Sequence, residues 1–194
     1  RILSSAASDV YKRQDFYGSK YTSSRIKTKK SWKYGRFEIR AKLPKGIGTW
    51  AAFWGLPTEW KYGNWPNSGE IDVLEHVGFE EGHIVSSVHN IAHHGDLSRS
   101  DQTKYIIAKD VVNSFNDYIL EWDEKEIKTY VNEKLIFSYP KNDQPWERWP
   151  FDEKFHFILN IAIGGNWGGM KGIDDTAFPT KMEIEHFRVY KKNT

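Results

Sequence analysis

Residues 34–43, YGRFEIRAKL, alternate between two kinds of side chain. Phe37, Ile39, Ala41 and Leu43 are apolar. The residues that alternate with them are charged, namely Arg36, Glu38, Arg40 and Lys42. Successive side chains of a β-strand point to opposite faces, so this pattern predicts a strand with one buried face and one solvated face.

The same period of two recurs along the rest of the chain. It predicts further strands within residues 118–122, 127–131, 155–163 and 182–190. Asn132 and Glu133 follow the second of these runs and predict a hairpin turn. A short helix is expected only over residues 106–115. Many short strands separated by turns indicate an all-β fold, a sandwich of two antiparallel sheets.

Length and composition set limits on function. The 194 residues fit one domain, 1–194, and contain no apolar run of about 18 residues that could span a membrane. The net charge of +2 argues against a nucleic-acid partner, and the absence of cysteine excludes disulfides and thiolate chemistry. Nine Trp, ten Tyr and eleven Phe are more rings than one core readily encloses, which indicates that some line a groove.

The first residues of the chain fit this pattern poorly. Residues 1–14, RILSSAASDVYKRQ, have no initiator Met, no apolar segment of a signal peptide and no period that continues into the following sequence. We therefore expect them to be non-native or disordered.

One predicted strand carries three carboxylates. Glu70 and Asp72 share a face, but strict alternation would turn Glu75 toward the apolar side. A β-bulge at Val73 or Leu74 would return Glu75 to the face of the other two. Like charges at this spacing raise at least one pKa, which separates a proton donor from an ionised nucleophile, as glycoside hydrolysis requires. The alternative is a solvated acidic edge strand without a function.

Four tryptophans lie shortly upstream of this strand, at Trp50, Trp54, Trp60 and Trp65. Exposed indole rings suit the flat faces of sugars. The alternative for each ring is packing in the core or in a loop. Their position beside the carboxylates favours a sugar-binding groove.

The stretch 65–75, WPNSGEIDVLE, resembles the signature of glycoside hydrolase family 16, in the bulged form typical of laminarinases. Other stretches are similar to landmarks of that family and occur in the same order along the chain. They are YTSSRI (21–26), YGRFEIRAKLP (34–44), TWAAFW (49–54), SVH (87–89), WPFD (149–152), LNIAIGGNWGG (159–169) and residues 178–190. The resemblance therefore covers residues 21–190, approximately.

The resemblance implies a β-jelly-roll sandwich with a concave substrate groove. It also implies an endo-acting hydrolase that cleaves β-1,3-glucan with retention of configuration. Glu70 would be the nucleophile, Glu75 the general acid/base, and Asp72 the residue that assists Glu70. We expect Glu75 to hold the proton and Glu70 to be ionised, because the negative field of its neighbours raises the pKa of Glu75.

Six further residues match groove positions of the family and are expected to bind substrate. They are Trp54, Trp65, His89, Trp167, Arg40 and Asn160. Trp54 and Trp65 would stack on sugars near the cleavage point, and His89 and Trp167 would lie on the far side of the groove.

The chain also departs from the family pattern. Family domains usually begin with an additional segment before the Tyr21 region, and they often hold a structural calcium through N-terminal groups and an Asp near the last strand. Glu185 stands in place of that Asp, which argues against calcium, and we expect no cofactor and no metal. A metal site drawn from His89, His93, His94 and Asp96 matches no zinc spacing.

Two alternatives remain open from the sequence. The first is a same-family enzyme that acts on mixed-linkage glucan or a galactan, because loops set specificity. The second is a non-catalytic carbohydrate-binding module, which could lose the carboxylates that this chain retains. A polymeric substrate implies an extracellular or periplasmic protein, and we expect a monomer whose partner is a polysaccharide, with no nucleic acid and no membrane.

Overall fold

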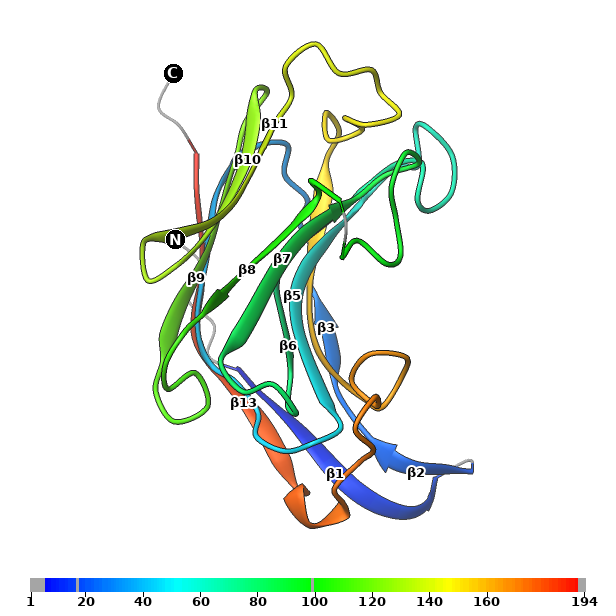
Figure 1. Ribbon diagram of the computed structural model, residues 1–194, viewed down its shortest axis with the longest axis vertical. Helices are drawn as coiled ribbons and strands as arrows, with labels where there is room; N and C mark the ends of the chain where they lie inside the picture. Colours follow the sequence, from blue (N-terminus) through cyan, green and yellow to red (C-terminus); the bar gives the residue numbers. More distant parts are fainter. Residues whose placement is uncertain (1–5, 17, 99, 192–194) are drawn as a thin grey trace.

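The chain forms two β-sheets that pack face to face, as the alternation predicted (Figure 1). The computed structural model describes residues 6–16, 18–98 and 100–191. The first sheet has seven strands, in the order β11 (Lys134–Pro140), β10 (Glu126–Val131), β9 (Asn116–Trp122), β4 (Gly35–Lys42), β13 (Thr180–Tyr190), β1 (Ala6–Phe16) and β2 (Ser19–Thr22).

The second sheet carries the predicted carboxylate strand. Its six strands run in the order β3 (Arg25–Lys27), β12 (Phe155–Ile163), β5 (Thr49–Pro57), β6 (Glu70–Val77), β7 (His83–His89) and β8 (Thr103–Ile107). Neighbouring strands in both sheets are antiparallel over the part of the chain that the structure describes.

The core lies between the sheets and is rich in aromatic rings. Phe37 of β4 and Phe157 of β12 come from opposite sheets, and their ring centroids are 4.4 Å apart. Trp122 is buried and donates its indole N–H to the carbonyl of Phe151, at 3.0 Å. The inward side chains of the six-stranded sheet pack in this core. The other face of that sheet is therefore available to form a site.

The hairpin turn is confirmed. Asn132 and Glu133 join β10 to β11, and both have positive φ angles, 48° and 64°. Two consecutive residues with positive φ are typical of the tight turn that matches the twist of paired strands.

The helix expected over residues 106–115 does not form. Strand β8 runs to Ile107, and a turn follows in which Asp110 has a φ of 61°. Val111 and Val112 lie in this turn, and both side chains are buried. The carbonyl of Val111 accepts a hydrogen bond from the backbone N–H of Leu43. Their apolar spacing therefore reflects burial of a strand end and a turn. The described residues contain a 3₁₀ turn at Asp175–Ala177 and no helix that is long and apolar enough to cross a membrane.

Residues 1–14 were expected to be non-native or disordered, and the expectation of disorder is wrong from Ala6 onward, because residues 6–16 form strand β1 of the seven-stranded sheet. Its register with β13 runs from Ala6 opposite Ile184 to Val10 opposite Thr180. Pairing through backbone hydrogen bonds requires no alternation of side chains, so the sequence pattern gave no sign of it. Residues 1–5 lie outside the described part of the chain.

Candidate active site

The carboxylate strand β6 has the predicted bulge. Val73 and Leu74 together lie opposite the single residue Ser86 of β7, and the hydroxyl of Ser86 donates to the carbonyl of Val73 at 2.6 Å. Both bulge residues are fully buried in the core. The extra residue turns Glu75 to the face that Glu70 already occupies.

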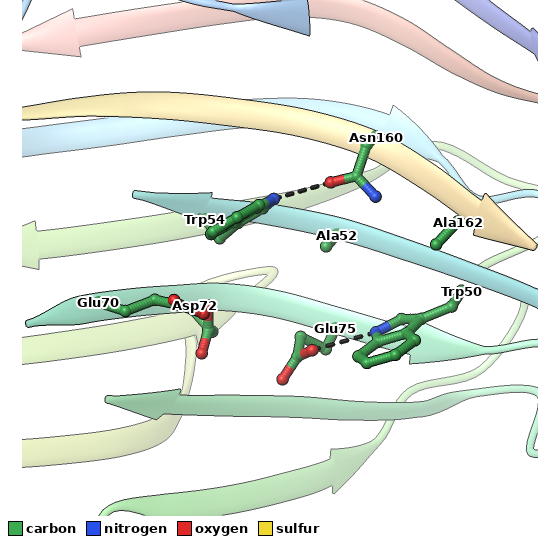
Figure 2. Close-up of a pocket in the computed structure, with 8 residues that line it drawn as sticks. All are labelled: Trp50, Ala52, Trp54, Glu70, Asp72, Glu75, Asn160 and Ala162. Atoms are coloured by element: carbon green, nitrogen blue, oxygen red, sulfur yellow. Dashed lines mark hydrogen bonds between the residues drawn. The ribbon is translucent and has the colours of Figure 1, made fainter. Parts of the chain in front are cut away.

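The outer face of the six-stranded sheet is hollowed above this strand. Figure 2 shows the three carboxylates of β6 on one side of the hollow, with side chains of β5 and β12 beside them. The residues that line it are Trp50, Ala52, Trp54, Glu70, Asp72, Glu75, Asn160 and Ala162. The structure thus brings the three predicted carboxylates together with two of the predicted substrate-binding residues.

Each glutamate accepts a hydrogen bond from a tryptophan. The indole N–H of Trp65 donates to Glu70 at 2.8 Å, and that of Trp50 donates to Glu75 at 3.0 Å. The indole of Trp54 donates instead to the amide oxygen of Asn160, at 2.7 Å. Trp50 is a site residue that was not predicted to bind substrate, although it is one of the four tryptophans shortly upstream of the carboxylates.

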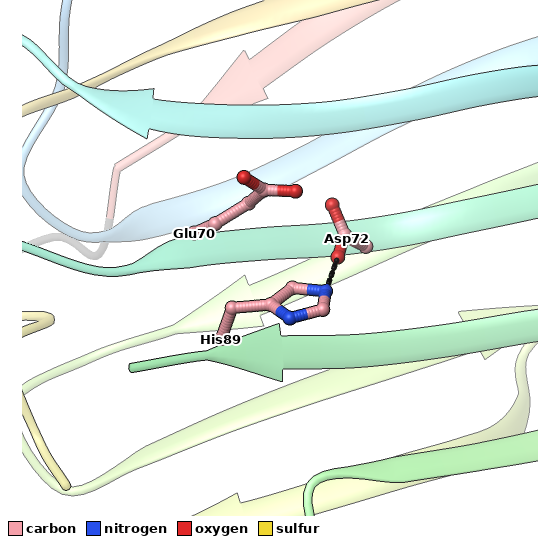
Figure 3. Close-up of side chains that lie close together, drawn as sticks. All are labelled: Glu70, Asp72 and His89. Atoms are coloured by element: carbon pink, nitrogen blue, oxygen red, sulfur yellow. Dashed lines mark ion pairs between the residues drawn. The ribbon is translucent and has the colours of Figure 1, made fainter. Parts of the chain in front are cut away.

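Asp72 is buried between Glu70 and two residues of β7. The hydroxyl of Ser87 donates to Asp72 Oδ2 at 3.0 Å, and His89 Nε2 lies 3.0 Å from the same oxygen (Figure 3). The backbone N–H of Gly95 donates to His89 Nδ1, so a neutral His89 carries its proton on Nε2 and donates it to Asp72. Ser87 and His89 therefore fix the orientation of Asp72.

Burial is the largest cause of a raised pKa at both Glu70 and Glu75. Burial raises the pKa of Glu75 well above its usual range, the charge of Asp72 raises it further, and the N–H of Trp50 opposes the change. This direction favours a protonated Glu75, although burial and not the charge of its neighbours is the larger cause.

The pKa of Glu70 is also raised, by burial first and by Asp72 second, which differs from the expected ionised state. The charge of Asp72 and a hydrogen bond between the two side chains both contribute to this rise, so the carboxyl groups of Glu70 and Asp72 interact directly.

The remaining predicted residues separate into two groups. Trp167 lies at the groove, where its ring meets that of Trp50 edge to face with centroids 5.5 Å apart. Arg40 does not lie there. It belongs to β4 in the other sheet, where it pairs with Asp117 and Glu185 at 3.1 and 3.0 Å. The expectation that Arg40 binds substrate is therefore corrected.

Among the described residues, one group has ligand atoms close enough together to hold a metal ion. The ligand atoms of Glu70, Asp72 and His89 all lie within 4.8 Å of one another (Figure 3). Hydrogen bonds from Trp65 to Glu70 and from Ser87 to Asp72 already use oxygens of this group. The set drawn from His93, His94 and Asp96 does not converge with His89 among the residues that the structure describes.

Paired glutamates in a groove are the groups that glycoside hydrolysis uses, and the tryptophans beside them suit sugar rings, so the site is that expected of a glycoside hydrolase. The model of a family described as glycosyl hydrolases family 16 matches residues 4–186, and the chain belongs to this family. Its fold is accordingly the β-jelly-roll sandwich that the resemblance implied. The match begins within the segment 1–14, which was expected to be non-native or disordered.

Relatives and solved structures are similar over most of the chain. A β-glucanase of Rhodothermus marinus is 42% identical over 187 residues, which are 92% of this chain and 65% of the relative. Glucan endo-1,3-β-glucosidase A1 of Niallia circulans is 37% identical over 186 residues, 90% of this chain and 27% of the relative. The X-ray structure of the laminarinase from Rhodothermus marinus has a TM-score of 0.93 and 39% identity, covering 98% of this chain and 78% of that one. The chain thus spans less than two thirds of either curated relative.

Proposed function

We propose that this chain is an endo-acting, retaining β-1,3-glucanase that cleaves laminarin-type polysaccharides. The observation that carries the proposal is the bulge in β6, which sets Glu70 and Glu75 on one face with Asp72 between them. The relatives named above as a β-glucanase, a laminarinase and an endo-1,3-β-glucosidase support the choice of glucan. A polymeric substrate also favours an extracellular or periplasmic location.

The first step forms a bond between the enzyme and the sugar. A carboxylate oxygen of Glu70 attacks the anomeric carbon while Glu75 gives its proton to the departing glycosidic oxygen, and the released chain leaves as an alcohol. Glu70 needs to be ionised for this attack. In this proposal the proton of the pair is on Asp72, which leaves Glu70 as a carboxylate that accepts hydrogen bonds from Trp65 and from Asp72.

The second step releases the sugar. Glu75, now a carboxylate, takes a proton from a water molecule, whose oxygen attacks the anomeric carbon and displaces Glu70. Two successive inversions give a product of retained configuration. The N–H of Trp50 supports Glu75 while it is ionised between the two steps.

Release of reducing sugar from laminarin, mixed-linkage glucan, agarose and carrageenan tests the proposal. We expect laminarin to be cleaved fastest. Faster cleavage of mixed-linkage glucan, agarose or carrageenan would assign the chain another substrate of the same family. Binding of laminarin without release of reducing ends from any of the four would identify a binding module instead.

Trp65→Ala is expected to weaken oligosaccharide binding by about 1–3 kcal/mol, because the ring is 44% exposed at the groove and a sugar can stack on it. Calorimetry in a Glu75→Gln background, where the ligand is not hydrolysed, measures the change. Trp65→Phe is the matched variant. It keeps a ring but loses the N–H donated to Glu70, so its affinity should fall less than that of Trp65→Ala while its turnover falls in an otherwise intact enzyme. Equal affinity of the Trp65, Trp65→Ala and Trp65→Phe proteins would show that Trp65 packs in the loop and does not bind sugar.

A further inference from the structure

One row of paired residues crosses the whole six-stranded sheet through the acid/base residue. From Glu75 toward one edge, the register pairs Glu75 with Ala52 of β5, Ala52 with Asn160 of β12, and Asn160 with Arg25 of β3. Toward the other edge it pairs Glu75 with Val85 of β7, and Val85 with Tyr105 of β8. Figure 1 shows β7 and β8 in succession beside β6.

Directly paired residues of an antiparallel sheet share a face, so Val85 and Tyr105 belong to the face of the carboxylates. Side-chain contacts agree with the register. Ser87, two residues from Val85 along β7, bonds to Asp72 in the groove. His83, two residues from Val85 in the other direction, packs edge to face against Tyr105 with ring centroids 4.3 Å apart.

Tyr105 is exposed, and its ring packs against the imidazole of His83. Its side chain is 65% exposed, while the imidazole of His83 packs against it and is itself fixed by Glu80 at 2.9 Å from Nδ1. Two strand spacings separate Tyr105 from Glu75, roughly 10 Å along the row. A polysaccharide that is bound at the carboxylates and runs along this row would pass over the ring.

We propose that Tyr105, positioned by His83, is a substrate-contact residue that stacks on a sugar of the glucan chain on the β8 side of the carboxylates. This inference rests on the proposed function, since it extends the same groove. The flat, amphipathic ring of tyrosine suits a sugar face, and the contact proposed is made by the ring and not by the hydroxyl. The occupant is the polysaccharide itself, because the ring continues the groove floor from Glu75 without a change of face.

The test compares Tyr105→Ala with Tyr105→Phe and with Tyr190→Ala. Tyr190 is a matched control, an exposed tyrosine of β13 in the other sheet. The kcat/KM of each protein is measured on an aryl β-glucoside and on laminarihexaose. We expect Tyr105→Ala to lose about five- to tenfold on the hexaose and nothing on the aryl glucoside, whose single sugar is too short to reach the ring. Tyr105→Phe and Tyr190→Ala should stay within about twofold of the unmodified protein on both substrates.

Three results would overturn the inference. They are an unchanged kcat/KM of Tyr105→Ala on the hexaose, an equal loss on both substrates, and a loss in Tyr105→Phe as large as in Tyr105→Ala. If the unmodified protein hydrolyses neither substrate, the proposed function is wrong, and this result alone does not decide the role of Tyr105. Retardation of the same variants in native gels that contain laminarin then decides the role of Tyr105, because unchanged retardation of Tyr105→Ala excludes the contact.

Discussion

Glu70→Gln is expected to lower kcat on laminarin by at least about a hundredfold while the fold and the binding of polysaccharide persist. The amide cannot attack the anomeric carbon, so the step that forms the enzyme–sugar bond is lost. Glutamine nearly preserves the volume of the side chain and can still accept the hydrogen bond that Trp65 donates to this position. The loss should therefore appear in turnover and not in stability.

Glu75→Gln should lose a similar factor, since the amide has no acidic proton for the leaving oxygen. Glu185→Gln is the matched control, because Glu185 lies on β13 of the other sheet and bonds to Arg40 there. Initial rates, thermal unfolding and affinity for laminarin measured on the three variants separate chemistry from folding. Near-normal hydrolysis by Glu70→Gln or Glu75→Gln would remove that residue from the mechanism.

Phe157→Ala is expected to lower the free energy of unfolding by about 3–5 kcal/mol. Phe157 is fully buried, and its ring meets those of Phe37 in the opposite sheet and Phe53 in its own, with centroids 4.4 and 5.6 Å away. Removal of the ring leaves a cavity at the centre of the sandwich, beneath the strands that carry the site.

Denaturant titration measures this change. Tyr190→Ala serves as the surface comparison and should cost no more than about 0.5 kcal/mol, because Tyr190 is 44% exposed. A cost below about 1 kcal/mol for Phe157→Ala would show that the two sheets do not depend on this contact.

The architecture was predictable where one face of a strand is buried. Phe37 and Phe157 lie in runs of alternating side chains, and both runs became strands of the sandwich. The bulge at Val73 and Leu74 was predictable for a related reason, since strict alternation would have left Glu75 buried in the core without a partner.

Other features carried no such signal. Strand β1 is paired through its backbone, and that pairing leaves no side-chain period in the sequence. Arg40 matched a family position, but alternation places a residue on a face of a strand and does not say to which sheet the strand belongs. The bonds of Trp50 to Glu75 and of Ser87 to Asp72 cross between strands, so they depend on register that one sequence does not reveal.

The roles of the two glutamates are the central claim, and chemical rescue by azide tests them most directly. With an activated aryl β-glycoside, whose leaving group needs no acid, Glu75→Ala still forms the bond to Glu70, and azide then displaces Glu70. The account predicts a β-glycosyl azide of retained configuration from Glu75→Ala. Glu70→Ala, offered a β-glycosyl fluoride, should give the inverted α-azide, because azide takes the place of the missing nucleophile. An α-azide from Glu75→Ala together with a β-azide from Glu70→Ala would show that the roles are reversed.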